Sequence, residues 1–168
     1  TQGTSTVEIK KFVRASSTVL IFVDKITGYI YGYPLETGKI YQISNTVVPG
    51  VYDAHFFANG SRVIIRHVDR ENDEVTALIA TVPSTKPDGE ATSLINTTTL
   101  SSLVTSVAVN RGDDRVSYVV STGNGSTIYT LSANGTVPIA SSPFREWDLS
   151  YGGESLFVTS KPSAYVAG

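Results

Sequence analysis

The chain has 168 residues, of which 40% are hydrophobic and 17% are charged, and its formal net charge is -2. This composition is that of a globular protein long enough to bury a core, and it excludes a disordered tail. Lys and Arg are scattered rather than gathered in a stripe, so we expect no nucleic-acid partner. The absence of cysteine excludes disulfide and thiolate chemistry. No apolar run is long enough to span a bilayer, so we expect membrane association only through an anchor that this sequence does not contain.

Short β-branched and aromatic runs recur along the chain, while helical periodicity is almost absent. In chain order they include TVLIFVD, GYIYGY, VYDAHFF, SRVIIRHVD, EVTALIATV, VTSVAVN, RVSYVVST, STIYTLSA and ESLFVTS. Turns rich in Gly, Asn and Asp separate them, because these residues accept the backbone angles of tight hairpins. The sequence therefore predicts an all-β fold.

Comparable turns recur at intervals of roughly 40 to 50 residues, with about four strands in each interval, which is typical of a β-propeller. The expected blades cover residues 7–49, 51–98, 103–144 and, incompletely, 145–168. Closed propellers have about four to eight blades, so we expect part of a larger or assembled propeller. Such a ring would be completed by a longer chain, by the N-terminal strand or by copies that pair their open edges. A β-sandwich is the alternative fold.

Two segments, TGYIYGYPLETGKIYQISNTVVPGVYDAHF and SSPFREWDLSYGGESLFVTSKPSAYVAG, carry a set of more specific elements. These are Thr-Gly-x-Ile-Tyr, Glu-Thr-Gly-Lys, Ile-Ser-Asn-Thr, Ser-Ser-Pro-Phe-x-Glu-Trp and Thr-Lys-Pro-Ser-Ala, the last with Ser160 in place of its Thr. These elements, and the order in which they occur, resemble those of uncharacterised extracytoplasmic β-propeller-like proteins of Candidate Phyla Radiation (Patescibacteria) bacteria. The resemblance implies a propeller at the cell surface, often anchored at its N-terminus and continuing beyond the last element matched here. It implies no catalytic residues.

Common catalytic motifs are absent, among them Gly-x-Ser-x-Gly, His-Glu-x-x-His and the phosphate-binding and dinucleotide loops, so we expect neither an enzyme nor a cofactor. The first strands of two expected blades carry Asp53 and His55, and Trp147 and Asp148. Because such strands line the channel of a propeller, these residues are candidates for ligand binding. Carboxylates facing one another there would suit acid-base work on a glycoside. Turn hydrogen bonds for the acidic residues, and packing between blades for Trp147, are the alternative roles.

The acidic run DRENDE places Asp69, Glu71 and Asp73 at alternate positions, as in a calcium-binding loop. It lacks the glycine and the closing bidentate glutamate of such loops. We interpret it as a solvated hairpin tip, with weak calcium binding as the alternative and no other metal site.

Four Asn-x-Ser/Thr triplets are candidate glycosylation sites, at Asn59, Asn96, Asn124 and Asn134. Three of them are also Asn-Gly pairs, for which a turn is a sufficient explanation. Asn96 is the one that turn chemistry explains least.

The run GYIYGY places Tyr29, Tyr31 and Tyr33 on one face of a strand, with Ile30 and Gly32 on the other. Aromatic side chains there suit packing between blades. If no neighbouring blade covers that face, it is a candidate ligand-binding surface instead.

We therefore expect a non-enzymatic, extracytoplasmic β-propeller module that acts as a scaffold or binds a protein or a glycan. One alternative is a structural subunit that self-associates through edge strands into a dimer or fibre. The other is a glycoside-acting propeller enzyme.

Overall fold

The computed structural model describes residues 13–16, 19–58, 60–69, 71, 73–83 and 95–161, which form β-strands and no helix. The predicted all-β class is therefore confirmed. The strands are β1 (Val13–Ser16), β2 (Val19–Val23), β3 (Ile30–Pro34), β4 (Tyr41–Gln42), β5 (Val51–Phe56), β6 (Arg62–Asp69), β7 (Glu74–Thr81), β8 (Thr97–Ser102), β9 (Val104–Val109), β10 (Val116–Thr122), β11 (Gly125–Ser132), β12 (Gly135–Ser142), β13 (Trp147–Gly152) and β14 (Ser155–Ser160).

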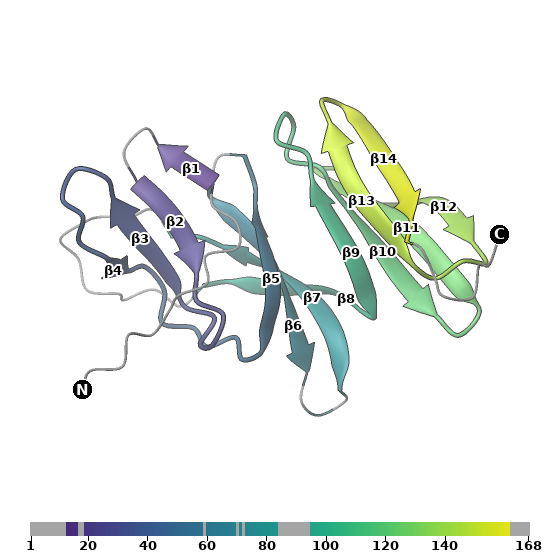
Figure 1. Cartoon of the computed structure of the whole chain (residues 1–168), viewed down its shortest axis with the longest axis horizontal. Coiled ribbons are helices and arrows are strands. Elements are labelled where there is room, and N and C mark those ends of the chain that lie inside the picture. Colours follow the sequence, from purple (N-terminus) through teal and green to yellow (C-terminus); the bar gives the residue numbers. More distant parts are fainter. Residues whose placement is uncertain are drawn as a thin grey trace. The chain divides into compact units, whose positions relative to one another are not determined.

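The strands form four sheets in which neighbours in space are also neighbours in sequence (Figure 1). Three sheets have four strands each, in the orders β1-β2-β3-β4, β5-β6-β7-β8 and β12-β11-β10-β9, and the fourth consists of β13 and β14. The pairs whose register is defined are all antiparallel. The chain divides into two compact units, residues 1–100 and 101–168.

In the first unit, two four-stranded sheets share one apolar core. Alternation along β2 and β3 turns Ile21 and Ile30 into it, and β6 contributes Val63 and Ile65. The other buried members are Ile43, Val48, Val51, Phe56, Leu78, Ala80, Val82 and Ile95. Burial of this apolar surface, at about 25 cal/mol per Å², is the main force that holds the two sheets together.

The hairpin between β2 and β3 is fixed by the segment from Asp24 to Gly28. The Asp24 carboxylate accepts hydrogen bonds from the backbone N–H and the hydroxyl of Thr27, and the Asp24 carbonyl accepts one from the Gly28 N–H. Gly28 has a φ of 74°, and a Cβ there would lie 2.4 Å from the Val48 carbonyl oxygen. Only glycine fits this position, and the turn sets where β3 begins.

In the second unit, the sheet β9–β12 packs against the hairpin β13–β14. Their shared core contains Ala108, Val119, Ile128 and Leu149. Polar contacts join the sheets as well. The Leu149 N–H donates to Ser106 Oγ at 3.1 Å, and Ser117 Oγ lies 2.8 Å from the Tyr151 hydroxyl.

Candidate functional site

The first sheet carries a row of aromatic side chains on the face opposite the core. Ile30 points into the core, so the alternating Tyr31 and Tyr33 point the other way. Phe22 of β2 stands opposite Tyr31, and the two rings stack with centroids 5.6 Å apart and an interplanar angle of 21°. The ring of Tyr29 meets that of Tyr31 edge-on, with centroids 6.5 Å apart. We call Phe22, Tyr29, Tyr31 and Tyr33 the tyrosine face.

Exposure and charge define what the tyrosine face can bind. Phe22 is buried, whereas the three tyrosines are half-buried. Burial raises the pKa of the Tyr31 phenol, and the nearby Asp24 carboxylate and Tyr29 raise it further. Tyr31 therefore keeps its proton at neutral pH. The face offers apolar rings edged by hydroxyls, a chemistry that suits a sugar ring or an apolar protein segment.

Tyr41 lies on the opposite face of the same sheet. It pairs with Gly32 across β3 and β4 and packs against the core. A Cβ on Gly32 would lie 2.4 Å from Tyr41 Cζ, so the ring occupies the space that the glycine leaves. Of the neighbouring strands β3 and β4, which both carry tyrosine, only β3 contributes to the tyrosine face.

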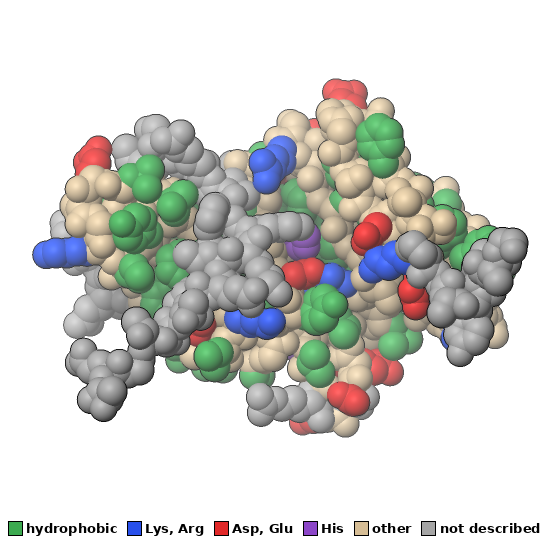
Figure 2. Space-filling view, in the orientation of Figure 1, with side chains coloured by type: hydrophobic (Ala, Val, Ile, Leu, Met, Phe, Trp, Pro, Cys, Tyr) green, Lys and Arg blue, Asp and Glu red, His purple; other side chains and the backbone are tan. Residues whose placement is uncertain are grey.

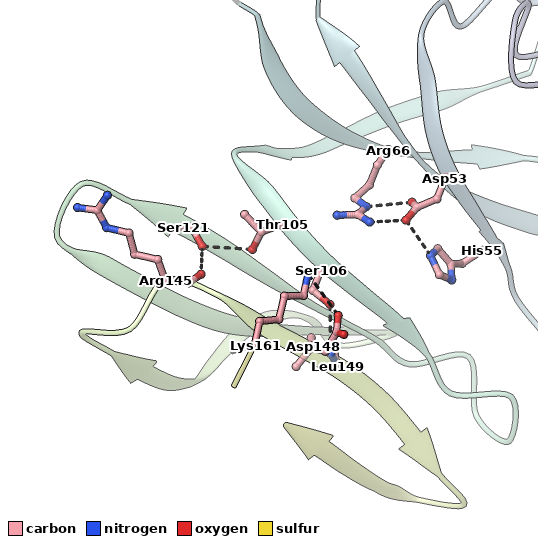
Figure 3. Close-up of polar contacts among 10 residues, drawn as sticks. All are labelled: Asp53, His55, Arg66, Thr105, Ser106, Ser121, Arg145, Asp148, Leu149 and Lys161. Atoms are coloured by element: carbon pink, nitrogen blue, oxygen red, sulfur yellow. Dashed lines mark hydrogen bonds and ion pairs between the residues drawn. The ribbon is translucent and has the colours of Figure 1, made fainter. Parts of the chain in front are cut away.

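Asp53 and His55 form a polar cluster with Arg66 on β5 and β6 (Figure 3). Asp53 Oδ1 accepts a hydrogen bond from Arg66 Nε at 2.9 Å, and Asp53 Oδ2 pairs with Arg66 Nη2. His55 Nε2 lies 3.5 Å from the same Oδ2. The Arg66 guanidinium also lies over the Tyr52 ring, 4.9 Å from its centroid. The sequence-based candidates Asp53 and His55 are thus in contact.

The electrostatics of this cluster oppose proton transfer by Asp53. Burial alone would raise the pKa of Asp53, but the hydrogen bonds and charges of Arg66 and His55 outweigh it and hold the pKa well below its usual range. A glycosidase acid needs the reverse, a carboxyl whose pKa is raised. Asp53 is therefore an anion at neutral pH, and its carboxylate oxygens bind Arg66 and His55.

The Trp147 side chain packs within the second unit rather than projecting from its surface. Its indole Nε1 donates to Ser126 Oγ at 2.9 Å and to the Phe144 carbonyl at 3.2 Å. Ser126 Oγ in turn donates to the Phe144 carbonyl at 2.6 Å. Trp147 also packs against the core that contains Leu149, and its ring meets the exposed Phe144 edge-on at 6.1 Å. This geometry is that of a packing residue with a satisfied N–H.

Asp148 points away from Trp147, because adjacent residues of a strand face opposite sides of the sheet. Its side chain is 70% exposed and lies 3.5 Å from Lys161 Nζ (Figure 3). The two candidates on β13 therefore do not converge on one site.

The acidic run is the tip of the β6–β7 hairpin, which closes with the pair Asp69 and Glu74. Asp69 Oδ1 accepts the Glu71 backbone N–H at 3.0 Å, and Asp73 has a positive φ of 54°. The Asp69 carboxylate thus stabilises the turn by accepting a backbone hydrogen bond. Over the part of the chain that the structure describes, no three His, Asp or Glu residues converge to hold a metal ion.

The candidate glycosylation sites differ in their backbone setting. Asn124 and Asn134 lie exposed in the two-residue loops of the β10–β11 and β11–β12 hairpins. Asn96 precedes β8, and its carbonyl accepts the Thr81 N–H at 3.0 Å. Asn59 lies outside the described residues.

Sequence reasoning missed two residues of these clusters, Phe22 and Arg66. The alternation in TVLIFVD could have placed Phe22 on the face opposite Ile21. A charged residue within the apolar run SRVIIRHVD is itself a sign of a buried ion pair, because a strand of this kind has both faces covered.

Charged side chains of both signs are scattered over the face shown in Figure 2, without a large patch of one sign. No known family model matches the chain, and no match was found among the curated proteins. Within the described ranges there is no helix with the length and apolar character to cross a bilayer.

Proposed function

We propose that the chain is a non-enzymatic β-propeller-type module that binds a protein or glycan ligand on the tyrosine face. The observation that carries this proposal is the row of three half-buried tyrosines on the side of β2 and β3 turned away from the core, with Tyr31 stacked on the buried Phe22 and met edge-on by Tyr29. Sugar rings and apolar side chains pack on such surfaces, and the phenol hydroxyls fix their orientation.

The order of the strands supports the propeller within this proposal. Three successive sheets are four-stranded meanders, and a fourth begins with β13 and β14. Propeller blades are built in this way, whereas sandwiches use Greek-key connections that move the chain between sheets. The resemblance to extracytoplasmic propeller-like proteins supports the same fold and a location at the cell surface.

The environment of the two candidate carboxylates favours binding over catalysis. Asp53 is held by Arg66 and His55 with a lowered pKa. Asp148 is exposed beside Lys161 and faces away from Trp147. Neither residue is arranged as a general acid for glycoside hydrolysis.

The test screens the protein against an array of neutral and acidic cell-envelope oligosaccharides and against purified cell-envelope proteins. Any ligand found is titrated into the wild type and into Tyr31→Ser and Tyr33→Ser variants whose folding is checked by circular dichroism. We expect each substitution to weaken binding about fivefold or more, because stacking on one ring contributes roughly 1 kcal/mol or more. Tyr52→Ser, which removes an exposed tyrosine of β5, is the matched control and should bind as the wild type does. Absence of any ligand, or equal affinity of the Tyr31→Ser variant, contradicts the proposal.

A further inference from the structure

In the hairpin β13–β14, strand β14 leaves one of its two edges unpaired within the described residues. The pairing of β14 with β13 is continuous from Trp147 opposite Ser160 to Gly152 opposite Ser155. On its other side, β14 has no neighbouring strand within the described ranges, whereas each of the other three sheets has four strands.

The backbone groups on this open edge follow from one hydrogen bond. The Lys161 N–H donates to the Glu146 carbonyl at 3.1 Å, so this pair is hydrogen-bonded. Antiparallel pairs alternate between hydrogen-bonded and non-hydrogen-bonded positions. Every second residue from Lys161 back along β14 therefore directs its N–H and C=O toward β13. The intervening residues, Leu156, Val158 and Ser160, direct theirs outward.

This edge lacks the features that usually prevent strand pairing. By comparison, β12, an outer strand of the four-stranded sheet in the same unit, carries Pro138 and a register shift beside it. Proline and irregular register are both common protections of edge strands. In contrast, β14 has the sequence SLFVTS, with no proline, no charge and a regular register. Its Phe157 and Val158 are 56% and 40% exposed.

We propose that β14 pairs in antiparallel fashion with β14 of a second copy of this chain, which joins two hairpins into one four-stranded sheet. A two-fold axis requires that facing residues lie on the same side of the sheet. The register centred on Val158 meets this condition and pairs Val158 with its own counterpart. It also pairs Leu156 with Ser160 of the second copy, so all outward N–H and C=O groups find partners.

The charges next to β14 are compatible with this register. Lys161 stands opposite the uncharged Ser155 of the second copy, and Phe157 stands opposite Thr159. Glu154 and Lys161 lie just outside the two ends of the strand, so no like charges face each other across the axis. A wholly polar or charged edge would not offer such a fit. This association does not depend on ligand binding to the tyrosine face.

Sedimentation equilibrium over roughly 1 µM to 1 mM tests the association, because an interface of this small size is expected to be weak. The mass should rise from 18.0 kDa toward twice that value with increasing concentration. It should stop there, because an isologous contact closes at two copies. A constant mass of one copy, or masses beyond two copies, overturns the proposal. A constant mass would mean that the open edge of β14 does not pair with β14 of a second copy.

Substitutions at the axis show whether β14 is the contact. Val158→Lys and Val158→Glu should each give a protein of single-copy mass, since like charges would face each other, while an equimolar mixture should restore the pair. Val137→Lys on the exposed strand β12 is the matched control and should associate as the wild type does. Ser160→Pro removes one outward N–H and should weaken pairing, while Ser160→Ala should not. Wild-type association of both Val158 variants, or failure of their mixture to associate, overturns the proposal.

Discussion

Arg66 binds both carboxylate oxygens of Asp53, and the two residues stand opposite each other on β5 and β6. The Arg66 side chain is 9% exposed and that of Asp53 is 24% exposed. Two charges at these depths must compensate each other, because an unpaired buried charge is strongly unfavourable. The pair therefore locks the register of the two strands just after the irregularity between Val51 and Asp53.

Replacement of Arg66 by Leu should destabilise the protein by about 3 kcal/mol, because it leaves the Asp53 carboxylate without its main partner. Urea unfolding followed by far-UV circular dichroism measures the change. In an Asp53→Asn background the same substitution should cost much less, since no charge is then left unpaired.

The exposed pair of Lys161 and Asp148 is the control for this experiment. Lys161→Ala should change the free energy of unfolding by less than about 1 kcal/mol, as is usual for surface pairs. Equal losses in the Arg66→Leu and Lys161→Ala variants would contradict the assignment of Asp53 and Arg66 as a buried pair.

The same pair should make stability depend on acid pH. The pKa of Asp53 in the folded protein lies below that of the unfolded chain. Its contribution is therefore complete above the unfolded pKa, about 4, and is lost as the pH falls from there toward the folded pKa. The difference in unfolding free energy between the wild type and Asp53→Asn should shrink between about pH 5 and pH 2.

Urea unfolding at several pH values measures this difference, and the remaining carboxylates largely cancel in it. Asp148→Asn, which removes an exposed carboxylate, is measured in parallel. A gap between wild type and Asp53→Asn that is constant with pH would show that Arg66 does not hold the charged form of Asp53.

The all-β class was predictable because its signals are local. Alternation in IYGYP places Ile30 and Tyr31 on opposite faces of the strand. Gly28 marks the preceding turn, at a position with no room for a side chain. Such features require only neighbouring residues. The arrangement of the sheets relative to each other depends on contacts between distant segments, which a single sequence does not specify.

For the same reason, the sequence could not predict which residues contact each other within the candidate sites. Val51 pairs with His67, and continuing that register would place Tyr52 opposite Arg66. The irregularity that follows Val51 places Asp53 there instead. One inserted residue thus places the Asp53 carboxylate opposite Arg66, while the Tyr52 ring stays close enough for the guanidinium to lie over it. Trp147 was similarly identified from its position, but its bond to Ser126 depends on a strand 21 residues away.

Gly32→Ala should destabilise the first unit by about 1 to 3 kcal/mol, because the added Cβ collides with the Tyr41 ring. The effect should diminish in a Tyr41→Ala background, where the space is vacant. Thermal unfolding of the four proteins in the cycle measures this coupling. Gly123→Ala, where a Cβ meets nothing within 4 Å, is the control and should cost less than about 0.5 kcal/mol. Additive losses in the cycle would contradict the contact between Gly32 and Tyr41.

Ser126→Ala should loosen the attachment of β13 to β11. The substitution removes the acceptor of the Trp147 indole and the donor to the Phe144 carbonyl, so it should cost about 1 to 2 kcal/mol. Trp147 is the sole tryptophan of the chain, so its fluorescence reports this site alone. We expect a red shift of emission in the native protein, because the indole N–H loses its nearer acceptor and keeps only the longer bond to the Phe144 carbonyl, which lets water approach it. Ser141→Ala, which removes an exposed contact with Thr127, should leave the emission unchanged. Identical spectra of wild type and Ser126→Ala would mean that the bond to Phe144 alone positions the indole.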